Sequence, residues 1–584
     1  MFRKINALIS TKQKIALIFI FFGNFLITGL EFLSLASIPL IISLIISPDF
    51  IESNIPIFKL FIENLIFEKG NYKNLFVLIF FLFLIKNLFL GIILFLEAKF
   101  AFNLRTSLTN KLFKKYLEMP YLFHANSNPG KLIRNVVVEV SYCCSVISQI
   151  LIVFREVLLL LIISLLLILY NELIILPVLF VLGTLISLFF YLIKKTIKNR
   201  GKSTQVRRAI INTKVNELIN GIKEIKVFSK QKIILKNFKK IFYLTEFNSF
   251  FIKVINSFPK LILEMTGVAF IVILYFIYDY LNYQVLDFLP ILSLIAVSSI
   301  RAIPSISSLV VCLNNIIFQS PAVNLVHRDL SLSHLDMSND INQDISTFFK
   351  KRILLKDISF KYPERKKNVI DKISIEIKRG KKIGIIGSSG SGKSTLINLI
   401  LGLIKPSNGS IYIDDKKLED LNLNLWRKQI GYVSQNIFLI DDNIKNNVAF
   451  GENQIKKNKL DKALKKSNLF EFVKTLPNKE LTNIGNNGIK VSGGQHQRIG
   501  IARALYNEPK IFIMDEATSS LDFKTEDEIV KDLNLKKSNL TAIIVSHRPR
   551  SVENCDIVYY LDKGKVKDFG KYKYLLKKYK KLKS

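Results

Sequence analysis

The chain has 584 residues, half of them hydrophobic, and its 83 basic against 46 acidic residues give a formal net charge of +37. A chain this apolar is not a wholly soluble protein, and its length suffices for two or three domains. Because the basic residues are dispersed and many flank apolar segments on one side, the charge predicts a membrane and argues against a nucleic-acid partner.

Six apolar segments in the first 330 residues are long enough to cross a bilayer, which takes about 20 residues. They are residues 15–46, 75–96, 145–169, 173–193, 252–280 and 286–317. The first is too long for a cleaved signal peptide, so we expect it to remain as a membrane helix. Basic loops alternate with loops poor in basic residues, which places both termini and the two long basic loops in the cytoplasm.

Three segments outside the six spans have more than one interpretation. Residues 118–124 and 221–226 lie at the tips of the two basic loops, and we expect them to dock on the following domain; ordinary surface turns are the alternative. Residues 55–68 mix apolar and charged residues, which fits a short external amphipathic helix or a plain loop.

Three basic residues, Lys86, Lys260 and Arg301, fall within the predicted spans. A basic side chain at the centre of a bilayer costs about 2.5–3.5 kcal/mol on insertion scales, so each should meet an acid or a wet cavity. The side chains of Glu264, four residues after Lys260, and of intramembrane Glu31 would serve internal pairing. The other interpretation, which we favour because the bases outnumber the evident acids, is a cationic cavity for a phosphate or pyrophosphate headgroup.

The sequence changes character after the membrane half. We assign residues 1–330 to the membrane domain, the polar residues 331–349 to a linker and residues 350–584 to a second domain. There, short β-branched runs alternate with helical segments, the pattern of an α/β nucleotide-binding domain. The predicted fold is therefore an all-α six-helix transmembrane domain followed by an α/β domain with a phosphate loop.

The phosphate loop follows an apolar run at residues 383–386 and matches G-x-x-x-x-G-K-[ST] between a strand and a helix. Its glycines let backbone N–H groups point at phosphate oxygens, Lys393 neutralises the β and γ phosphates, and the Ser394 hydroxyl ligates Mg²⁺. The predicted ATP-binding residues of this loop are Gly387, Ser388, Gly390, Ser391, Gly392, Lys393, Ser394 and Thr395.

A second apolar run, residues 511–514, ends in Asp515 and Glu516. A carboxylate at a strand end beside a phosphate loop can hold Mg²⁺, so Asp515 is the predicted metal ligand. The next carboxylate can polarise an attacking water, so Glu516 is the predicted catalytic base.

Residues 491–495, Val-Ser-Gly-Gly-Gln, resemble the signature motif of ATP-binding cassette proteins. The family's other motifs are present in order, and the six-helix domain before them resembles that of exporter half-transporters. The resemblance implies ATP and Mg²⁺ as cofactors and a homodimer in which each signature motif closes on ATP held by the partner. The residues it adds to the nucleotide site are Tyr362 against adenine, Gln435 at Mg²⁺ and the attacking water, Ser492, Gly494 and Gln495 of the signature, Asp522 in the loop that contacts the partner, and His547 as a catalytic contact of the γ-phosphate.

Three positions depart from the family pattern. Val491 replaces the usual leucine, His496 follows the signature where a basic residue is common, and Asn486 stands where an acidic residue is usual. Val491 is a mild apolar exchange. By the resemblance, Asn486 lies in the segment that touches the membrane domain, so its departure concerns coupling and not the ATPase chemistry.

The membrane half and residues 431–439 resemble bacterial flippases of lipid-linked oligosaccharides. This resemblance implies ATP-driven export or flipping of an amphiphilic, anionic, polyprenyl-pyrophosphate-linked saccharide across the bacterial inner membrane. An exporter of another lipid, a lipopeptide or a drug is the alternative. An ATPase-gated channel or regulator is a third interpretation, against which Glu516 and His547 argue because they imply turnover.

Overall fold

The computed structural model describes residues 1–46, 73–170, 172–280, 285–332, 349–516, 540–546 and 549–579. The chain divides into two units, one of Met1–Met119 with Asn126–Ser333 and one of Pro120–Ala125 with His334–Ser584. The predicted external segment 55–68 and nearly all of the predicted linker lie outside the described residues.

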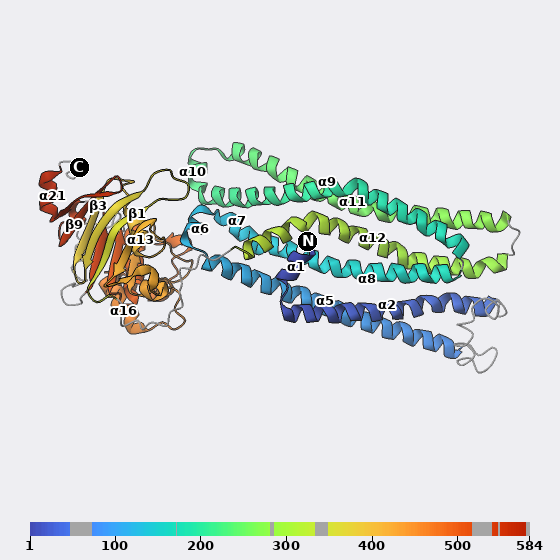
Figure 1. Ribbon diagram of the computed structural model, residues 1–584. Coiled ribbons are helices and arrows are strands. Elements are labelled where there is room, and N and C mark those ends of the chain that lie inside the picture. Colours follow the sequence, from blue (N-terminus) through green and yellow to red (C-terminus); the bar gives the residue numbers. More distant parts are fainter. Residues whose placement is uncertain are drawn as a thin grey trace. The chain divides into compact units, whose positions relative to one another are not determined.

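The N-terminal unit is helical (Figure 1). Its helices are α1 (Phe2–Leu8), α2 (Thr11–Ile46), α5 (Lys73–Glu118), α7 (Pro129–Arg134), the π-helix η1 (Asn135–Glu139), α8 (Val140–Tyr170), α9 (Glu172–Asn220), α10 (Ile222–Val227), α11 (Gln231–Tyr280) and α12 (Val285–Leu330). The six long helices among them coincide with the six predicted spans and extend well beyond several of them. Within the described residues, five segments have the length and hydropathy of a membrane span: Thr11–Ser37, Phe76–Glu118, Pro129–Ile168, Gln231–Ile273 and Ile295–Leu330.

The long helices of this unit pack side by side. Helix α12 packs most extensively on α8 and also contacts α2, α9 and α11, while α2 packs on α5 (Figure 1). Large apolar side chains such as Phe80, Phe95 and Leu161 remain exposed on these helices. Exposed apolar side chains of this kind suit a lipid environment, in which helices must satisfy their backbone groups internally.

The C-terminal unit is α/β and contains two sheets. The first has strand order β2-β1-β4-β5 and is antiparallel: β2 (Ile370–Lys378), β1 (Arg352–Phe360), β4 (Asn408–Ile413) and β5 (Lys416–Lys417). The second has order β10-β9-β3-β8-β7-β6: β10 (Lys565–Gly570), β9 (Ile557–Asp562), β3 (Lys382–Gly387), β8 (Thr541–Val545), β7 (Ile511–Asp515) and β6 (Ile430–Val433). All neighbours in the second sheet are parallel except β10, which pairs antiparallel with β9.

Helices surround these sheets and complete the unit. They are α6 (Tyr121–Asn126), most of which belongs to this unit, α13 (Lys393–Ile400), α14 (Leu423–Lys428), α15 (Ile444–Val448), α16 (Lys457–Lys466), α17 (Phe470–Thr475), α18 (Gly493–Tyr506) and α21 (Tyr572–Lys578). The predicted fold class is thus confirmed: a helical membrane domain is followed by an α/β nucleotide-binding domain.

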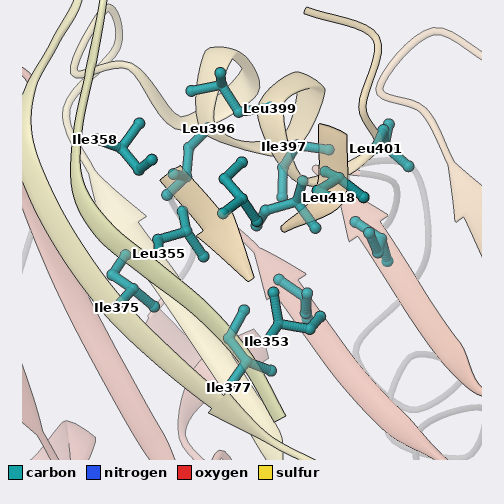
Figure 2. Close-up of a cluster of buried hydrophobic side chains, with 14 of the residues drawn as sticks. Ile353, Leu355, Ile358, Ile375, Ile377, Leu396, Ile397, Leu399, Leu401 and Leu418 are labelled. Carbon is teal, nitrogen blue, oxygen red and sulfur yellow. The ribbon is translucent and has the colours of Figure 1, made fainter. Parts of the chain in front are cut away.

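The main core of the C-terminal unit lies around α13. Figure 2 shows Leu355 and Ile377 of the antiparallel sheet facing Leu396 and Ile397 of α13. Side chains from the parallel sheet and the fully buried Trp426 complete the cluster. Because α13 starts at the end of the phosphate loop, this packing also fixes the loop.

We expect Leu355→Ala to destabilise the C-terminal unit by about 2–5 kcal/mol, because the residue is fully buried and the substitution leaves a cavity. This corresponds to a fall of roughly 5–15 °C in the melting transition of the unit. Trp426, the chain's one tryptophan, lies in the same cluster, so its fluorescence on heating reports the transition. Leu481→Ala is the matched control because Leu481 is 58% exposed, and equal midpoints for the two variants would contradict the assignment.

Candidate nucleotide-binding site

The predicted site residues follow the carboxyl ends of neighbouring parallel strands. The phosphate loop follows β3, Gln435 comes two residues after β6, and β7 ends in Asp515 with Glu516 next. Ligands of open α/β sheets bind outside the carboxyl ends of the strands, so this edge is the expected place for a nucleotide. Two predicted residues, Asp522 and His547, lie outside the described residues.

Two glycines give the phosphate loop its turn. Gly390 and Gly392 have φ angles of +77° and +103°, a region that residues with a Cβ rarely adopt. At Gly387 a Cβ would lie 2.3 Å from the carbonyl oxygen of Leu561, so only glycine fits there. The loop runs into the N-terminus of α13, where free backbone N–H groups and the helix dipole favour a phosphate.

Lys393, Glu516 and Gln435 form the polar centre of the site. The Lys393 Nζ donates to the carbonyl oxygens of Gly387 at 2.9 Å and Ser388 at 3.1 Å, and it lies 3.6 Å from Glu516 Oε1. The Gln435 Nε2 donates to Glu516 Oε2 at 2.9 Å. Both carboxylate oxygens of Glu516 therefore have partners, which fixes the orientation of the predicted base.

The backbone of Glu516 is itself unusual. Its φ angle is +52°, in the left-handed region, which costs about 1–3 kcal/mol for a residue other than glycine. Strain of this kind persists where the surrounding structure imposes it and is common at functional sites. The Glu516 N–H donates to the Val545 carbonyl oxygen at 2.9 Å, which ties the strained residue to β8.

Asp515 has the properties of a metal ligand. It is 4% exposed, and its Oδ1 makes no hydrogen bond within the described residues. Burial, and then the neighbouring Glu516 carboxylate, raise the pKa of Asp515, while Lys393 and hydrogen bonds with Ser394 and Tyr432 lower it. A buried carboxylate oxygen without a partner, next to a serine hydroxyl, fits the oxygen ligands that Mg²⁺ prefers.

Tyr362 lies beside the phosphate loop, where the sequence analysis expects the adenine-stacking ring. Its hydroxyl is 3.3 Å from the Thr395 Oγ1, and its ring meets Phe360 edge to face at 4.9 Å between centroids. The structure thus brings Tyr362 to the same loop as Lys393 and Ser394, and its contact with adenine stays a prediction.

The signature residues form a capped helix start. Ser492 is the N-cap of α18: its Oγ accepts from the Gln495 N–H at 3.3 Å, and the Gln495 Oε1 accepts from the Ser492 N–H at 2.9 Å. Such a reciprocal cap stabilises the start of a helix. Ser492 and Gly493 are exposed, so the N-terminus of α18 is open to a ligand.

The three departures from the family pattern lie close to this helix. The half-buried Val491 packs on the apolar cluster beneath α18, as a leucine would. The His496 ring lies against Gly488, where a Cβ would come within 2.6 Å of its Cδ2, and burial lowers the pKa of His496. Asn486 begins a 3₁₀ turn, Asn486–Gly488, whose last residue is the glycine that the His496 ring contacts.

The first predicted docking segment belongs to the C-terminal unit. Residues Pro120–Ala125 are part of that unit, and Leu122 packs against its main core. This is the association that the docking prediction requires for residues 118–124, and the prediction for residues 221–226 remains open.

The three intramembrane bases each meet a partner inside the N-terminal unit. The Arg301 Nε lies 2.5 Å from Glu31 Oε1, an ion pair whose angles fall outside hydrogen-bond geometry. The Lys260 Nζ is 3.7 Å from Glu264 Oε1, and the Lys86 Nζ lies 4.7 Å from the Phe83 ring centroid. The internal pairs weighed in the sequence analysis are therefore formed.

Sequence analysis missed a further charged group in the same unit. Glu97, which lies just outside the predicted span 75–96, is on α5 and pairs with Arg155 of α8 at 3.2 Å. Ser305 of α12 donates to the adjacent Glu156 at 2.6 Å. The sequence does contain a signal for this residue, because Glu97 directly follows the apolar segment 75–96 and a helix through that segment can continue past its end, as α5 does.

Comparison with known proteins gives a consistent result. The family model described as "ABC transporter" matches residues 370–519, and the model described as "ABC transporter transmembrane region" matches residues 13–299. The ATP-dependent lipid A-core flippase of Pseudoalteromonas translucida (strain TAC 125) is 30% identical over 486 residues, covering 80% of this chain and 81% of that protein. The protein of the same name from Wigglesworthia glossinidia brevipalpis is 28% identical over 489 residues, with 82% of each chain covered.

A solved structure supports the fold. The structure titled "Structure of a bacterial Atm1-family ABC exporter with ATP bound" superposes with a TM-score of 0.77, covers 95% of both chains and shares 18% sequence identity. Together with the domain matches, this likeness establishes a multi-pass membrane protein with a C-terminal ATPase domain.

We expect Glu516→Gln to lower ATP turnover by at least about a hundredfold, because a positioned base contributes 10²–10⁴ to a rate. Nucleotide binding should persist, since Lys393 and the phosphate loop are unchanged. Phosphate release and retention of labelled ATP measure the two effects. Glu471→Gln, on a side chain that is 80% exposed, is the control, and sustained hydrolysis by Glu516→Gln would show that another group is the base.

Proposed function

The chain belongs to the ABC transporter family, and from that premise we propose that it works as a homodimer that flips an anionic, amphiphilic lipid outward across a bacterial inner membrane. The coarser activity, ATP hydrolysis coupled to transport, follows from the family. The proposal concerns the subunit arrangement, the roles of the site residues and the substrate.

The observation that carries the proposal is the arrangement of Lys393, Glu516 and Gln435 at the phosphate loop. When ATP binds, its phosphate oxygens would take the place of Glu516 as the partner of the Lys393 ammonium group. Glu516, held by Gln435, then accepts a proton from the attacking water. Ser394 and Asp515 would hold Mg²⁺, which when bound neutralises charge on the transferring phosphate.

The homodimer is supported by the exposed start of α18. Each chain has one phosphate loop and one signature motif, so two chains complete two equivalent sites. Ser492 and Gly494 lie at a capped helix N-terminus, a surface that binds anions. This arrangement suits closure on the phosphates of ATP bound to a partner.

An anionic headgroup is supported by the bases on the membrane helices. Arg301 is 43% exposed although it pairs with Glu31, and Lys260 is 64% exposed beside Glu264. Lys86 lies close enough to Glu31 and Arg301 to interact with both charges. Exposed guanidinium and ammonium groups at this depth can exchange an internal carboxylate for a lipid phosphate.

The headgroup that we propose first is a polyprenyl-pyrophosphate-linked saccharide, on the resemblance of the membrane half to flippases of such lipids. Lipid A-core is the second candidate, because both relatives described above are named for its flipping. An exporter of another lipid, a lipopeptide or a drug would have the same ATPase motifs and would differ only in the substrate that it moves.

Reconstitution in liposomes separates these substrates. We expect outward movement of a polyprenyl-pyrophosphate glycan and stimulation of ATP hydrolysis by that lipid, with lipid A-core in a parallel set of vesicles and a hydrophobic dye in a third. A fluorescent label and an impermeant quencher measure the movement. Movement of lipid A-core alone would select the second candidate, and movement of the dye alone would contradict an anionic lipid substrate.

Charge neutralisation tests the proposed headgroup contacts. We expect Lys86→Gln and Lys260→Gln each to reduce flipping by about tenfold or more, which is the loss of one hydrogen bond to a charged group. Basal ATP hydrolysis should stay close to the unmodified rate, because the nucleotide site is untouched.

Arg301 needs a paired variant in that experiment. Removing it alone leaves the buried Glu31 without its ion pair, which destabilises a protein for reasons unrelated to substrate. The double variant Glu31→Gln/Arg301→Gln removes both charges, and Lys457→Gln on the exposed surface of α16 is the control. Full flipping by all three membrane variants would refute the anionic headgroup.

A further inference from the structure

Tyr432 is a residue next to the nucleotide site for which the ATPase motifs give no role. It lies on β6, opposite Ile513 of β7 in the parallel register, and Val433 lies opposite Met514. Side chains alternate along a strand, so Tyr432, Ile513 and Asp515 point to the same face. Asp515 is thus the next residue of β7 on the face that carries the Tyr432 side chain.

The Tyr432 hydroxyl lies close enough to the Asp515 carboxylate for the two side chains to interact. A tyrosine hydroxyl is protonated at neutral pH, so it is the donor and the carboxylate accepts. Ser394, at the start of α13, is the second hydroxyl that interacts with this carboxylate. These two hydroxyls approach Asp515 from two different elements.

One oxygen of the same carboxylate remains available. Asp515 Oδ1 is buried and makes no hydrogen bond to any residue in the described part of the chain. A buried carboxylate with one oxygen unpartnered is costly unless a cation reaches it. The arrangement resembles a metal ligand whose orientation is fixed from the side away from the metal.

We propose that Tyr432 is a positioning residue that orients the Asp515 carboxylate for Mg²⁺. This inference rests on the proposed assignment of Asp515 as the metal ligand. Groups that hydrogen-bond with a metal ligand fix its rotamer, and removing one typically weakens metal binding or activity by 10–100-fold. In this proposal Tyr432 acts through Asp515 and not by contacting the nucleotide.

A purely structural role for Tyr432 is the competing explanation. Its half-buried ring packs against the main core of the C-terminal unit, so a large truncation would disturb packing as well as the hydroxyl. Tyr432→Phe keeps the ring and removes only the donor. The variant therefore separates metal positioning from packing.

The test measures metal binding without turnover in the full-length protein. Mn²⁺ replaces Mg²⁺ as the probe, and electron paramagnetic resonance gives its dissociation constant from protein loaded with a non-hydrolysable ATP analogue. We expect Tyr432→Phe to raise the dissociation constant of Mn²⁺ by about tenfold. Binding of the nucleotide in EDTA and the melting temperature should equal those of the unmodified protein.

Two further variants make each outcome decisive. Asp515→Asn calibrates the assay, and unchanged Mn²⁺ binding in this variant would contradict the metal assignment itself. Tyr412→Phe removes a hydroxyl from a half-buried tyrosine of the other sheet and should leave Mn²⁺ binding unchanged. If Asp515→Asn weakens Mn²⁺ binding and Tyr432→Phe does not, Tyr432 has no positioning role. The same conclusion follows if Tyr432→Phe lowers both the melting temperature and the binding of nucleotide in EDTA, because the variant then disturbs packing.

Discussion

The ion pair between Lys393 and Glu516 is the interaction on which the nucleotide site of the C-terminal unit depends. It joins the residue that starts α13 to the residue that follows β7, two elements far apart in the sequence. Both side chains are largely buried, at 6% and 13% exposure, so the ion pair offsets part of the cost of burying each charge. The core around α13 keeps the ammonium group in place, and the left-handed backbone of Glu516 turns its carboxylate toward it.

The membrane helices obey the same rule that a buried charge needs a partner. Arg301 and Glu31 join α12 to α2, Arg155 and Glu97 join α8 to α5, and Ser305 and Glu156 join α12 to α8. Each of these contacts links two different helices. Movement of one helix against another must therefore either keep such a pair together or supply new partners, so the pairs restrict which helices can separate.

The sequence was informative where the chemistry is local. The phosphate loop and the Asp515–Glu516 pair each lie within one short segment and were assigned from the residue pattern, while the signature motif was assigned from its resemblance to the family. Tyr432 and Glu97 were missed because their partners depend on strand register and helix packing, which no short motif encodes. Glu97 was left outside the predicted span because the end of an apolar segment does not mark the end of a helix.

The pairing of the intramembrane bases bears on the proposed phosphate headgroup, because a membrane domain that binds such a headgroup must hold its basic residues before the lipid arrives. Lone ammonium or guanidinium groups at this depth would be costly, while the Glu31 and Glu264 carboxylates compensate much of that cost. A phosphate competes well with a carboxylate for guanidinium because it too can accept two parallel hydrogen bonds and it offers more acceptor oxygens. If the proposed anionic headgroup binds here, the acids would set a threshold that neutral lipids do not pass. The selectivity for charged lipids in that proposal would then arise from the internal pairs themselves.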